Sequence, residues 1–423
     1  MKISIFGTGY VGLVSGVCFA HLGNDVICID RNPTKIRTLN KGISTIYEPE
    51  LDNMLGDVVN NGKFKVTADA EDAILKTDIT FICVGTPSNE DGSTDLTSIF
   101  EAAEQIGKVL AKKNTHHIIV VKSTVPPGTT EKVDMTLQMS GANNYGIAMN
   151  PEFLREGHAV QDFLYPDRIV IGCNKHETSD KLRELYSFTL SPGPLLVTEI
   201  KVAEMIKYTS NAMLATKISF SNEIGNICKK LGIDVYDVMI GVGADKRIGP
   251  QFLNAGVGFG GSCFPKDVKS LIHTAKVNDV EPKILQAVMD TNELQPLRLL
   301  KLAKEKTGGL SGKNVAVLGI AFKPDTDDIR ESPFLTIAPR LLQMGALVTA
   351  YDPKAMENAT KLLGNGIKYA SSAREAVKDA DIVFVLTEWE EFMDESLYEG
   401  KQVFDGRHLW NKRSDGNYEG VCW

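Results

Sequence analysis

The first thirty residues contain the pattern that most restricts the fold of this chain. A short apolar segment leads directly into the sequence GTGYVG, in which Gly7, Gly9 and Gly12 have the spacing G-x-G-x-x-G. The composition of residues 11–22 is that of a buried helix, and the apolar segment after it ends in a carboxylate, Asp30. A strand, a glycine turn, a helix and another strand in this order are typical of a parallel sheet covered by helices on both faces.

The same alternation of strands and helices continues along the N-terminal part of the chain. Strands are expected at 79–84 and 118–122, with a helix at 96–111 between them. The segment 198–231 differs, because it lacks proline and has apolar residues at helical spacing. It predicts one long helix, followed by further helices to about residue 307.

The first pattern then returns near the C-terminus. Residues 312–322 (GKNVAVLGIAF) resemble the first strand, and residues 345–353 (GALVTAYDP) resemble the second, with Asp352 placed like Asp30. The first turn of this repeat lacks the pattern G-x-G-x-x-G, so it is expected to bind something other than a dinucleotide, or nothing. The predicted fold is α/β, with two doubly wound Rossmann-like domains joined by a long central helix and a helical middle domain. The expected domains are 1–197, 198–308 and 309–423.

Composition excludes several classes of protein. The chain has 423 residues, too many for one ordinary core, and acidic residues outnumber basic ones by 54 to 46 without a long Lys/Arg cluster. This argues against nucleic-acid binding. No apolar run is long enough to span a membrane and the first residues do not resemble a signal peptide, so a cytoplasmic protein is expected. Seven scattered cysteines and seven histidines without ligand spacing predict neither a disulfide framework nor a metal site.

The glycine motif has a specific physical interpretation in this context. Gly7 permits a tight turn, Gly9 lets backbone N–H groups approach a pyrophosphate, and Gly12 lets helix and strand pack closely. Asp30 would accept hydrogen bonds from ribose hydroxyls and repel a 2′-phosphate, which favours NAD over NADP, although the adjacent Arg31 weakens that preference. The alternative is a glycine-rich turn without a ligand.

A second glycine-rich segment, GVGFGGSCFPKDV, places a single thiol at the expected start of a helix. Cys263 precedes Pro265, Lys266 and Asp267. A cysteine at a helix N-terminus beside a lysine is expected to have a lowered pKa, and the glycines would let a ligand come close. A thiolate beside NAD can oxidise an aldehyde through a thiohemiacetal and a thioester. The alternative is a buried cysteine in a glycine turn.

This chemistry also needs a group that activates water and groups that stabilise an oxyanion. The segment NPEFLREG supplies Glu152 and Glu156. Lys207 and Asn211 are four residues apart on the expected long helix and therefore share a face. The alternative for these residues is a solvated face without catalytic function.

Taken together and in order, the motifs resemble the UDP-glucose/GDP-mannose dehydrogenase family over essentially the whole chain. They are GTGYVG, VGTPS, KSTVPPGTT, NPEFLREG, KYTSNAML, RIGPQFLNAGVGFGGSCFPKD, FKPDTDDIRESP and FDGR. The resemblance implies a four-electron oxidation at C6 of a nucleotide-linked sugar, in which two NAD are reduced and a thioester forms on the cysteine. Ser262 stands where members that act on N-acetylated sugars usually have histidine, which favours UDP-glucose as substrate and UDP-glucuronate as product. GDP-mannose and UDP-N-acetylhexosamines remain the alternatives.

The resemblance also implies roles for individual residues. The implied catalytic residues are Cys263 as nucleophile, Lys207 and Asn211 for the oxyanion, Asp267 and Thr124 for water, and Glu156 for thioester hydrolysis. The implied NAD contacts are Gly7, Gly9, Tyr10, Val11, Gly12, Asp30, Lys35, Thr86, Thr124, Glu156, Cys263, Lys266 and Arg330. The implied sugar-nucleotide contacts are Glu152, Phe153, Leu154, Glu156, Lys207, Asn211, Arg247, Phe252, Asn254, Gly260, Cys263, Lys323 and Arg407.

A homodimer is implied as well, with Arg247 reaching the substrate of the partner subunit. For Arg407, a surface arginine at a turn is the alternative interpretation. One departure from the family pattern is the loop that usually reads Tyr-Glu-Pro-Gly, since it ends here in Glu50. The sequence therefore does not determine the backbone conformation of this loop. The expected activity does not depend on this difference.

Two other functions compete with this interpretation. A sensor that binds the same ligands without chemistry would be expected to lack at least one of the residues Cys263, Lys207, Asn211, Asp267 and Glu156, and all five are present. A one-step alcohol dehydrogenase of the hydroxyacid type has a similar architecture but needs no cysteine beside the nicotinamide.

Overall fold

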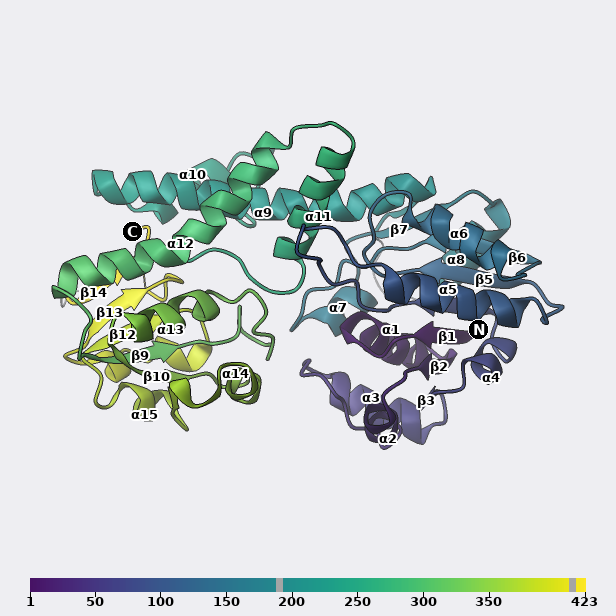
Figure 1. Ribbon diagram of the computed structural model, residues 1–423, viewed down its shortest axis with the longest axis horizontal. Coiled ribbons are helices and arrows are strands. Elements are labelled where there is room, and N and C mark those ends of the chain that lie inside the picture. The colour runs from purple at the N-terminus through teal and green to yellow at the C-terminus, as the bar shows by residue number, and fades with distance from the viewer. Residues whose placement is uncertain (188–192, 411–415) are drawn as a thin grey trace. The chain divides into compact units, whose positions relative to one another are not determined.

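A computed structural model describes residues 1–187, 193–410 and 416–423 of the chain. The backbone divides into two compact units, Met1–Ser210 and Asn211–Trp423 (Figure 1). Each unit contains one sheet with helices packed against it.

The first unit is built on an eight-stranded sheet with the order β3-β2-β1-β4-β5-β6-β7-β8. All neighbouring strands are parallel except β6 and β7, which are antiparallel. The order of β1 to β6 is that of a doubly wound dinucleotide-binding sheet, as predicted. The strands are β1 (Lys2–Phe6), β2 (Asp25–Ile29), β3 (Phe64–Thr67), β4 (Ile79–Ile82), β5 (His117–Val121), β6 (Tyr145–Met149), β7 (Ile169–Cys173) and β8 (Leu195–Thr198).

Helices cover both faces of this sheet because its strands are apolar on both sides. In β5, Ile118 and Val120 pack in one core with α1, α3, α7 and α8, whereas Ile119 and Val121 pack in another core with α4, α5 and α6. The helices are α1 (Tyr10–His21), α2 (Pro33–Leu39), α3 (Leu51–Asn60), α4 (Ala70–Leu75), α5 (Thr97–Leu110), α6 (Thr129–Met139), α7 (Ala159–Leu164) and α8 (His176–Tyr186).

The second unit contains a six-stranded, all-parallel sheet with the order β11-β10-β9-β12-β13-β14. This order repeats that of β1 to β6, so the predicted second doubly wound domain is confirmed. The strands are β9 (Asn314–Leu318), β10 (Leu347–Tyr351), β11 (Lys368–Tyr369), β12 (Ile382–Val385), β13 (Gln402–Asp405) and β14 (Tyr418–Gly420). The helices are α13 (Pro333–Gln343), α14 (Met356–Leu363) and α15 (Ala373–Val377), with 3-10 turns η1 (Gly364–Gly366), η2 (Glu390–Met393) and η3 (Glu395–Tyr398).

The predicted long helix is α9 (Ile200–Leu231), which begins in the first unit and ends in the second. It starts two residues later than expected because Thr198 ends β8, and the strands β7 and β8 were not predicted. Helices α10 (Val235–Gly243), α11 (Phe264–Val277) and α12 (Lys283–Thr307) follow, as expected. The division into three domains at 197 and 308 stays a prediction, since the backbone separates at residue 210 into two units.

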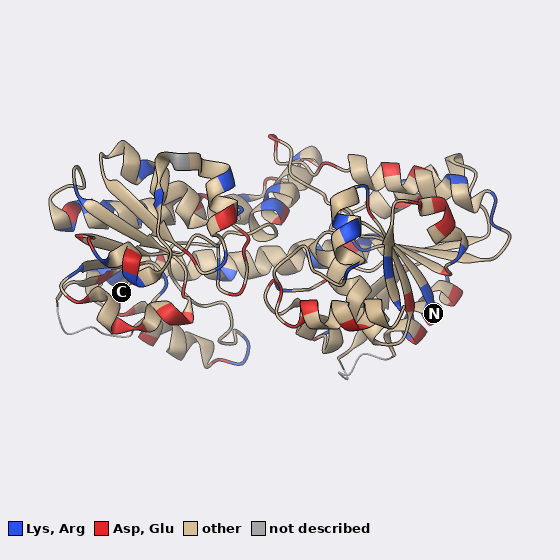
Figure 2. Ribbon diagram, turned by 90° about the horizontal axis from the view of Figure 1, so that it is seen from below, with Lys and Arg blue, Asp and Glu red and all other residues tan. Residues whose placement is uncertain are grey.

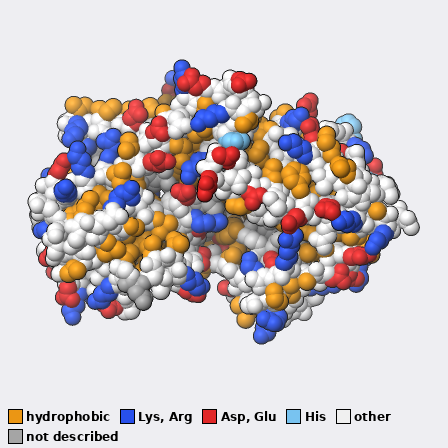
Figure 3. Space-filling view, in the orientation of Figure 1, with side chains coloured by type: hydrophobic (Ala, Val, Ile, Leu, Met, Phe, Trp, Pro, Cys, Tyr) orange, Lys and Arg blue, Asp and Glu red, His pale blue; other side chains and the backbone are white. Residues whose placement is uncertain are grey.

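Positions of acidic and basic residues are interspersed along the ribbon of both units (Figure 2). The face drawn in Figure 3 likewise mixes acidic, basic and apolar side chains. Within the described ranges, no helix combines the length and the apolar character needed to cross a membrane.

Candidate active site

The glycine turn between β1 and α1 has the geometry of an anion cradle. Gly7 has φ +94°, and a Cβ atom on it would lie 2.7 Å from the carbonyl oxygen of Cys83. A Cβ atom on Gly12 would lie 2.1 Å from the carbonyl oxygen of Gly7, so both positions require glycine for packing within the protein. Gly9 differs, because a Cβ atom there would meet no described atom within 4 Å. The open side of Gly9 therefore fits a pyrophosphate at the start of α1, where Tyr10 and Val11 are the first residues.

Asp30 lies directly after β2 and is fixed by the same turn. Its carboxylate accepts the N–H of Thr8 at 3.2 Å and the N–H of Asn32 at 2.8 Å, together with the Thr8 hydroxyl. Burial alone would raise the pKa of Asp30, but these hydrogen bonds and the charge of Lys35 outweigh it, so the pKa is lowered. An ionised carboxylate at this edge fits an acceptor of ribose hydroxyls.

The loops after β4 and β5 meet at the same carboxyl edge of the sheet. The hydroxyl of Thr86 donates to the carbonyl oxygen of Thr124 at 3.0 Å. Thr86 is buried and Thr124 is half-buried. The structure thus brings together two of the residues predicted near the nicotinamide, at the edge where ligands bind in open α/β sheets.

A buried ion pair joins two other predicted residues of the first unit. Lys207 Nζ lies 2.9 Å from Glu152 Oε1, and the two side chains are 4% and 6% exposed. Glu152 Oε2 accepts the N–H of Leu154 at 2.6 Å, and Lys207 Nζ lies 5.4 Å from the centre of the Phe153 ring. Lys207 is therefore not on a solvated face, and removing either partner would leave a buried charge.

Lys122, which directly follows β5, was not predicted as a site residue. It is 4% exposed, and its ammonium donates to Asn150 Oδ1 at 3.0 Å and to the Tyr186 hydroxyl at 3.3 Å. Burial lowers its pKa to about 8, while the neighbouring Glu152 acts in the opposite direction. The sequence signal that could have identified Lys122 is its position directly after the apolar strand β5. A lysine without a specific partner is usually exposed to solvent, so one that extends a buried strand is unusual.

In the second unit, Cys263 occupies the N-cap position of α11 and is half-buried. Asp267 lies one turn further on, and its N–H donates to the carbonyl oxygen of Cys263 at 2.9 Å. The Asp267 carboxylate is 1% exposed and accepts from Asn211 Nδ2 and Lys266 Nζ, each at 2.6 Å. Four predicted residues are therefore assembled around the start of one helix. Helix α9 places Asn211 one turn after Lys207, as expected.

The glycines before Cys263 pack closely against other segments of the protein. A Cβ atom on Gly256 would lie 2.5 Å from the carbonyl oxygen of Gly406, and one on Gly260 would lie 2.4 Å from that of Glu331. On Gly261 it would lie 2.8 Å from the ring of Phe322. These glycines let the loop fit against the protein's own segments, so space for a ligand is not needed to explain them.

Several predicted contact residues surround this loop. Phe252 is half-buried with φ +63°, and its ring centre lies 6.2 Å from that of Phe264. The carbonyl oxygen of Arg330 accepts the N–H of Gly261 at 2.8 Å. Lys323 is half-buried beside Phe322, whereas the Asn254 side chain is exposed. Phe252 and Arg330 are thus tied to the segment that carries Cys263, whereas Asn254 is exposed.

Arg247 and Arg407, two arginines predicted to contact the sugar nucleotide, differ in exposure and in their partners. Arg247 has a side chain that is 90% exposed and paired with Asp245 at 2.6 Å. Arg407 is 16% exposed and donates to the carbonyl oxygens of Leu386 at 2.8 Å, Phe322 at 3.0 Å and Gly258 at 3.3 Å. The alternative of a surface arginine at position 407 is therefore wrong, because its guanidinium fastens three backbone segments together.

In the second Rossmann-like domain, the carboxylate of Asp352 accepts backbone N–H groups of the turn that follows β9. Asp352 accepts the N–H groups of Ile320 at 2.8 Å and Ala321 at 2.9 Å. It also accepts from the indole of Trp389 at 3.1 Å. Asp30 takes the N–H of Thr8 in the same way, but Asp352 also takes the N–H of Ala321, the residue at the position of Gly9. That the second domain binds something other than a dinucleotide, or nothing, in this turn stays a prediction.

Family models match three successive parts of the chain. Residues 1–189 match the NAD binding domain of the UDP-glucose/GDP-mannose dehydrogenase family, residues 201–294 match its central domain, and residues 316–412 match its UDP binding domain. The chain belongs to this family. Its cofactor is NAD, which the open side of Gly9 and the ionised Asp30 fit.

Similar family members include UDP-glucose 6-dehydrogenase TuaD of Bacillus subtilis, which is 43% identical over 97% of this chain and 90% of its own length. The UDP-glucose 6-dehydrogenase of Rickettsia bellii is 45% identical over 93% of this chain and 90% of its own. Among solved structures, a UDP-glucose dehydrogenase of Pyrobaculum islandicum is 44% identical with a TM-score of 0.96, covering 100% of this chain and 97% of its own.

Proposed function

We propose that this member of the family is a UDP-glucose 6-dehydrogenase that converts UDP-glucose and two NAD to UDP-glucuronate. The observation that carries the reaction type is Cys263 at the start of α11, with the buried Asp267 one turn on and hydrogen-bonded to Asn211. The choice of sugar is supported by relatives of 43–45% identity that carry this name.

Bound NAD supplies the acceptor for each of the two hydrides. The C6 hydroxyl gives up a proton and a hydride and becomes an aldehyde. The Cys263 thiolate then adds to the aldehyde, and loss of the second hydride from C6 leaves a thioester on the sulfur. Water attacks the thioester, the thiolate leaves, and the carboxylate and protons are released.

The proposed roles follow the chemistry of each side chain. Lys207 and Asn211 stabilise negative charge on the C6 oxygen, because an ammonium and an amide N–H both donate to an oxyanion. Asp267, fixed by Asn211 and Lys266, orders the attacking water, and Thr124 holds water near the thioester. Glu156 assists hydrolysis. The other residues that the resemblance implies as contacts of NAD or of the sugar nucleotide are proposed to bind these two ligands.

Two further parts of the proposal concern the assembly and the place of action. A homodimer in which Arg247 reaches the partner's substrate is supported by large apolar side chains on α9 at seven-residue spacing. Met213, Phe220 and Ile227 are 58%, 52% and 51% exposed, and this spacing places them on one face. A cytoplasmic location stays a prediction.

The proposed function is tested by measuring NADH formation with UDP-glucose, GDP-mannose and the N-acetylated UDP-hexosamines. Two NADH per UDP-glucose, with UDP-glucuronate as product, is the expected result. Activity with GDP-mannose alone would overturn the substrate. One NADH per sugar with release of free aldehyde would overturn the thioester route.

A further inference from the structure

The loop before α3 contacts the segment at the start of α7. Glu48, in this loop, is 5% exposed. Its Oε2 accepts the N–H of Gly157 at 2.7 Å, and its Oε1 accepts the N–H of Ala159 at 2.6 Å. One buried carboxylate thus uses both oxygens on two amides of a single short segment, which fixes that backbone strongly.

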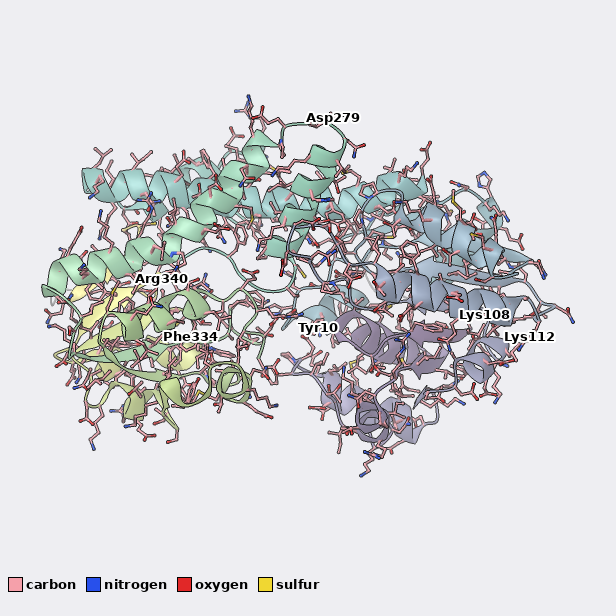
Figure 4. All side chains as sticks on the ribbon, viewed as in Figure 1. Tyr10, Lys108, Lys112, Asp279, Phe334 and Arg340 are labelled. Carbon is pink, nitrogen blue, oxygen red and sulfur yellow. The ribbon has the colours of Figure 1, made fainter. Side chains whose placement is uncertain are left out.

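The third partner of Glu48 is Tyr10, at the N-terminal end of α1 (Figure 4). The Tyr10 hydroxyl donates to Glu48 Oε2 and also lies 3.0 Å from the backbone nitrogen of Gly157. Burial raises the pKa of Tyr10 well above its usual value, and the bond to Glu48 and the charges of Glu48 and Glu156 raise it further. The phenol is therefore protonated and donates to the carboxylate throughout the physiological range.

These contacts join two functional segments that are far apart in the sequence. Tyr10 follows Gly9 in the glycine turn, and Gly157 follows Glu156 directly. A second contact of the same loop, from Gln161 Nε2 to Glu50 Oε2 at 2.7 Å, ties it to α7. The backbone next to Glu156 is thus held to the start of α1 by the Glu48 carboxylate and by the Tyr10 hydroxyl, which also accepts the N–H of Gly157.

We propose that Glu48 is a positioning residue for thioester hydrolysis, which acts by fixing the backbone that carries Glu156. This inference rests on the proposed function, since it assigns Glu48 to the step in which Glu156 acts. Glu48 itself contacts no reacting atom. Its largest effect is expected on hydrolysis, the step assigned to Glu156. Tyr10 and Glu156 are also expected NAD contacts, so the rates of hydride transfer are compared at saturating NAD, where they should change much less.

The variant Glu48→Gln tests this with little change in shape. A glutamine offers one acceptor oxygen and one NH₂ group, so it accepts from only one of the two amides and opposes the other. In rapid-mixing experiments with UDP-glucose at saturating NAD, the rate and amplitude of the NADH burst should change much less than the steady-state rate, which falls roughly ten-fold, the effect of one charge-assisted hydrogen bond. Mass spectrometry should show the acyl adduct accumulating on Cys263.

A second measurement needs neither cofactor nor substrate. Hydrogen exchange at the amides of Gly157 and Ala159 should be faster in Glu48→Gln than in the natural chain. Glu50→Gln is the matched control, because it neutralises a carboxylate of the same loop that contacts neither amide. Its steady-state rate should stay within about two-fold.

Glu48→Asp keeps the charge but shortens the side chain. It is the second test variant, to be used if Glu48→Gln does not fold. It should show the same selective slowing of hydrolysis. Equal loss of burst and steady-state rates, or unchanged rates in both variants, would overturn the inference. Absence of NADH formation by the natural chain would instead overturn the proposed function, so the two failures are distinct.

Discussion

At the scale of a single residue, Glu50 shows which backbone conformation the loop adopts at the position where the family usually has glycine. It has φ +67° and ψ −20°, and it is the N-cap of α3. The loop therefore keeps the left-handed conformation that a glycine would adopt without strain, although a side chain occupies the position. A non-glycine residue in this region costs about 1 kcal/mol.

The strain at Glu50 can be measured by comparing two small variants. Glu50→Ala and Glu50→Gly both remove the contact with Gln161, but only alanine retains a Cβ atom. The glycine variant should have a free energy of unfolding about 1 kcal/mol higher than the alanine variant. Urea denaturation of both proteins provides the measurement, and equal stabilities would argue against strain at this position.

Cys263 carries the second prediction at this scale. Cys263→Ser should lower the rate of acid formation at least about a thousand-fold, because a hydroxyl at this position is a far weaker nucleophile than a thiolate. Binding of NAD and UDP-glucose should change little. Cys173→Ser, at a half-buried cysteine on β7, is the control and should retain activity. Full acid formation by Cys263→Ser would refute the covalent step.

At the scale of an element, β5 starts with a buried histidine. His117 is 0% exposed, with Nε2 2.7 Å from the Thr80 hydroxyl and Nδ1 3.0 Å from Lys113 Nζ. The ammonium of Lys113 can only donate, so Nδ1 accepts and Nε2–H donates to Thr80. Burial, together with the smaller effect of the charge of Lys113, lowers the pKa of His117 to about 3.

This arrangement predicts acid sensitivity with a defined sign. Between pH 6.5 and about 3 the unfolded chain binds a proton on His117 that the folded chain does not bind, so stability falls as pH falls. The loss from this residue is about 2 kcal/mol at pH 5 relative to pH 7. The difference in unfolding free energy between the natural chain and His117→Gln should therefore be smaller at pH 5 than at pH 7 by that amount. The neighbouring His116→Gln provides the comparison.

At the scale of the whole molecule, the two units share one strand order, but the turn after the first strand, β1 or β9, differs between them. Asp30 accepts the N–H of Thr8 in a turn whose Gly9 side is open, whereas Asp352 accepts the N–H groups of both Ile320 and Ala321. Two similar folds are therefore expected to provide one dinucleotide site. Under the proposed function, the two NAD would therefore bind at this one site in succession.

The number of bound NAD tests this conclusion. Titration calorimetry should give one NAD per chain in the natural protein. Gly9→Val should abolish the binding, because a side chain would fill the open space at the start of α1. A second equivalent of NAD, or one that survives in Gly9→Val, would contradict the expectation that the second turn binds no dinucleotide.

The proposed dimer gives a second prediction at this scale. Phe220→Asp places a charge within the exposed apolar face of α9 and should weaken dimerisation at least about ten-fold. Sedimentation velocity over a range of concentrations measures the effect. Met139→Asp, at a position on α6 that is 89% exposed, is the control and should not change the association. A natural chain that stays monomeric at high concentration would refute the dimer.

The sequence alone was sufficient for the features that depend on spacing over a few residues. The glycine turn, the alternation of strands and helices, the repeat with Asp352 in place of Asp30, and Cys263 at a helix start are all patterns of this kind. Their physical basis is local, since backbone geometry and side-chain periodicity are set by near neighbours. The resemblance to the family rested on the same short motifs.

Only the tertiary structure determined which of these residues are paired, buried or turned inward. The pair Lys207–Glu152, the Asn211–Asp267 bond, the buried Lys122 and the Arg407 contacts join residues far apart in the chain. So do the close contacts that require the glycines before Cys263. Burial and partner set the energy of a charge or a small residue, and both depend on contacts that spacing along the chain does not specify.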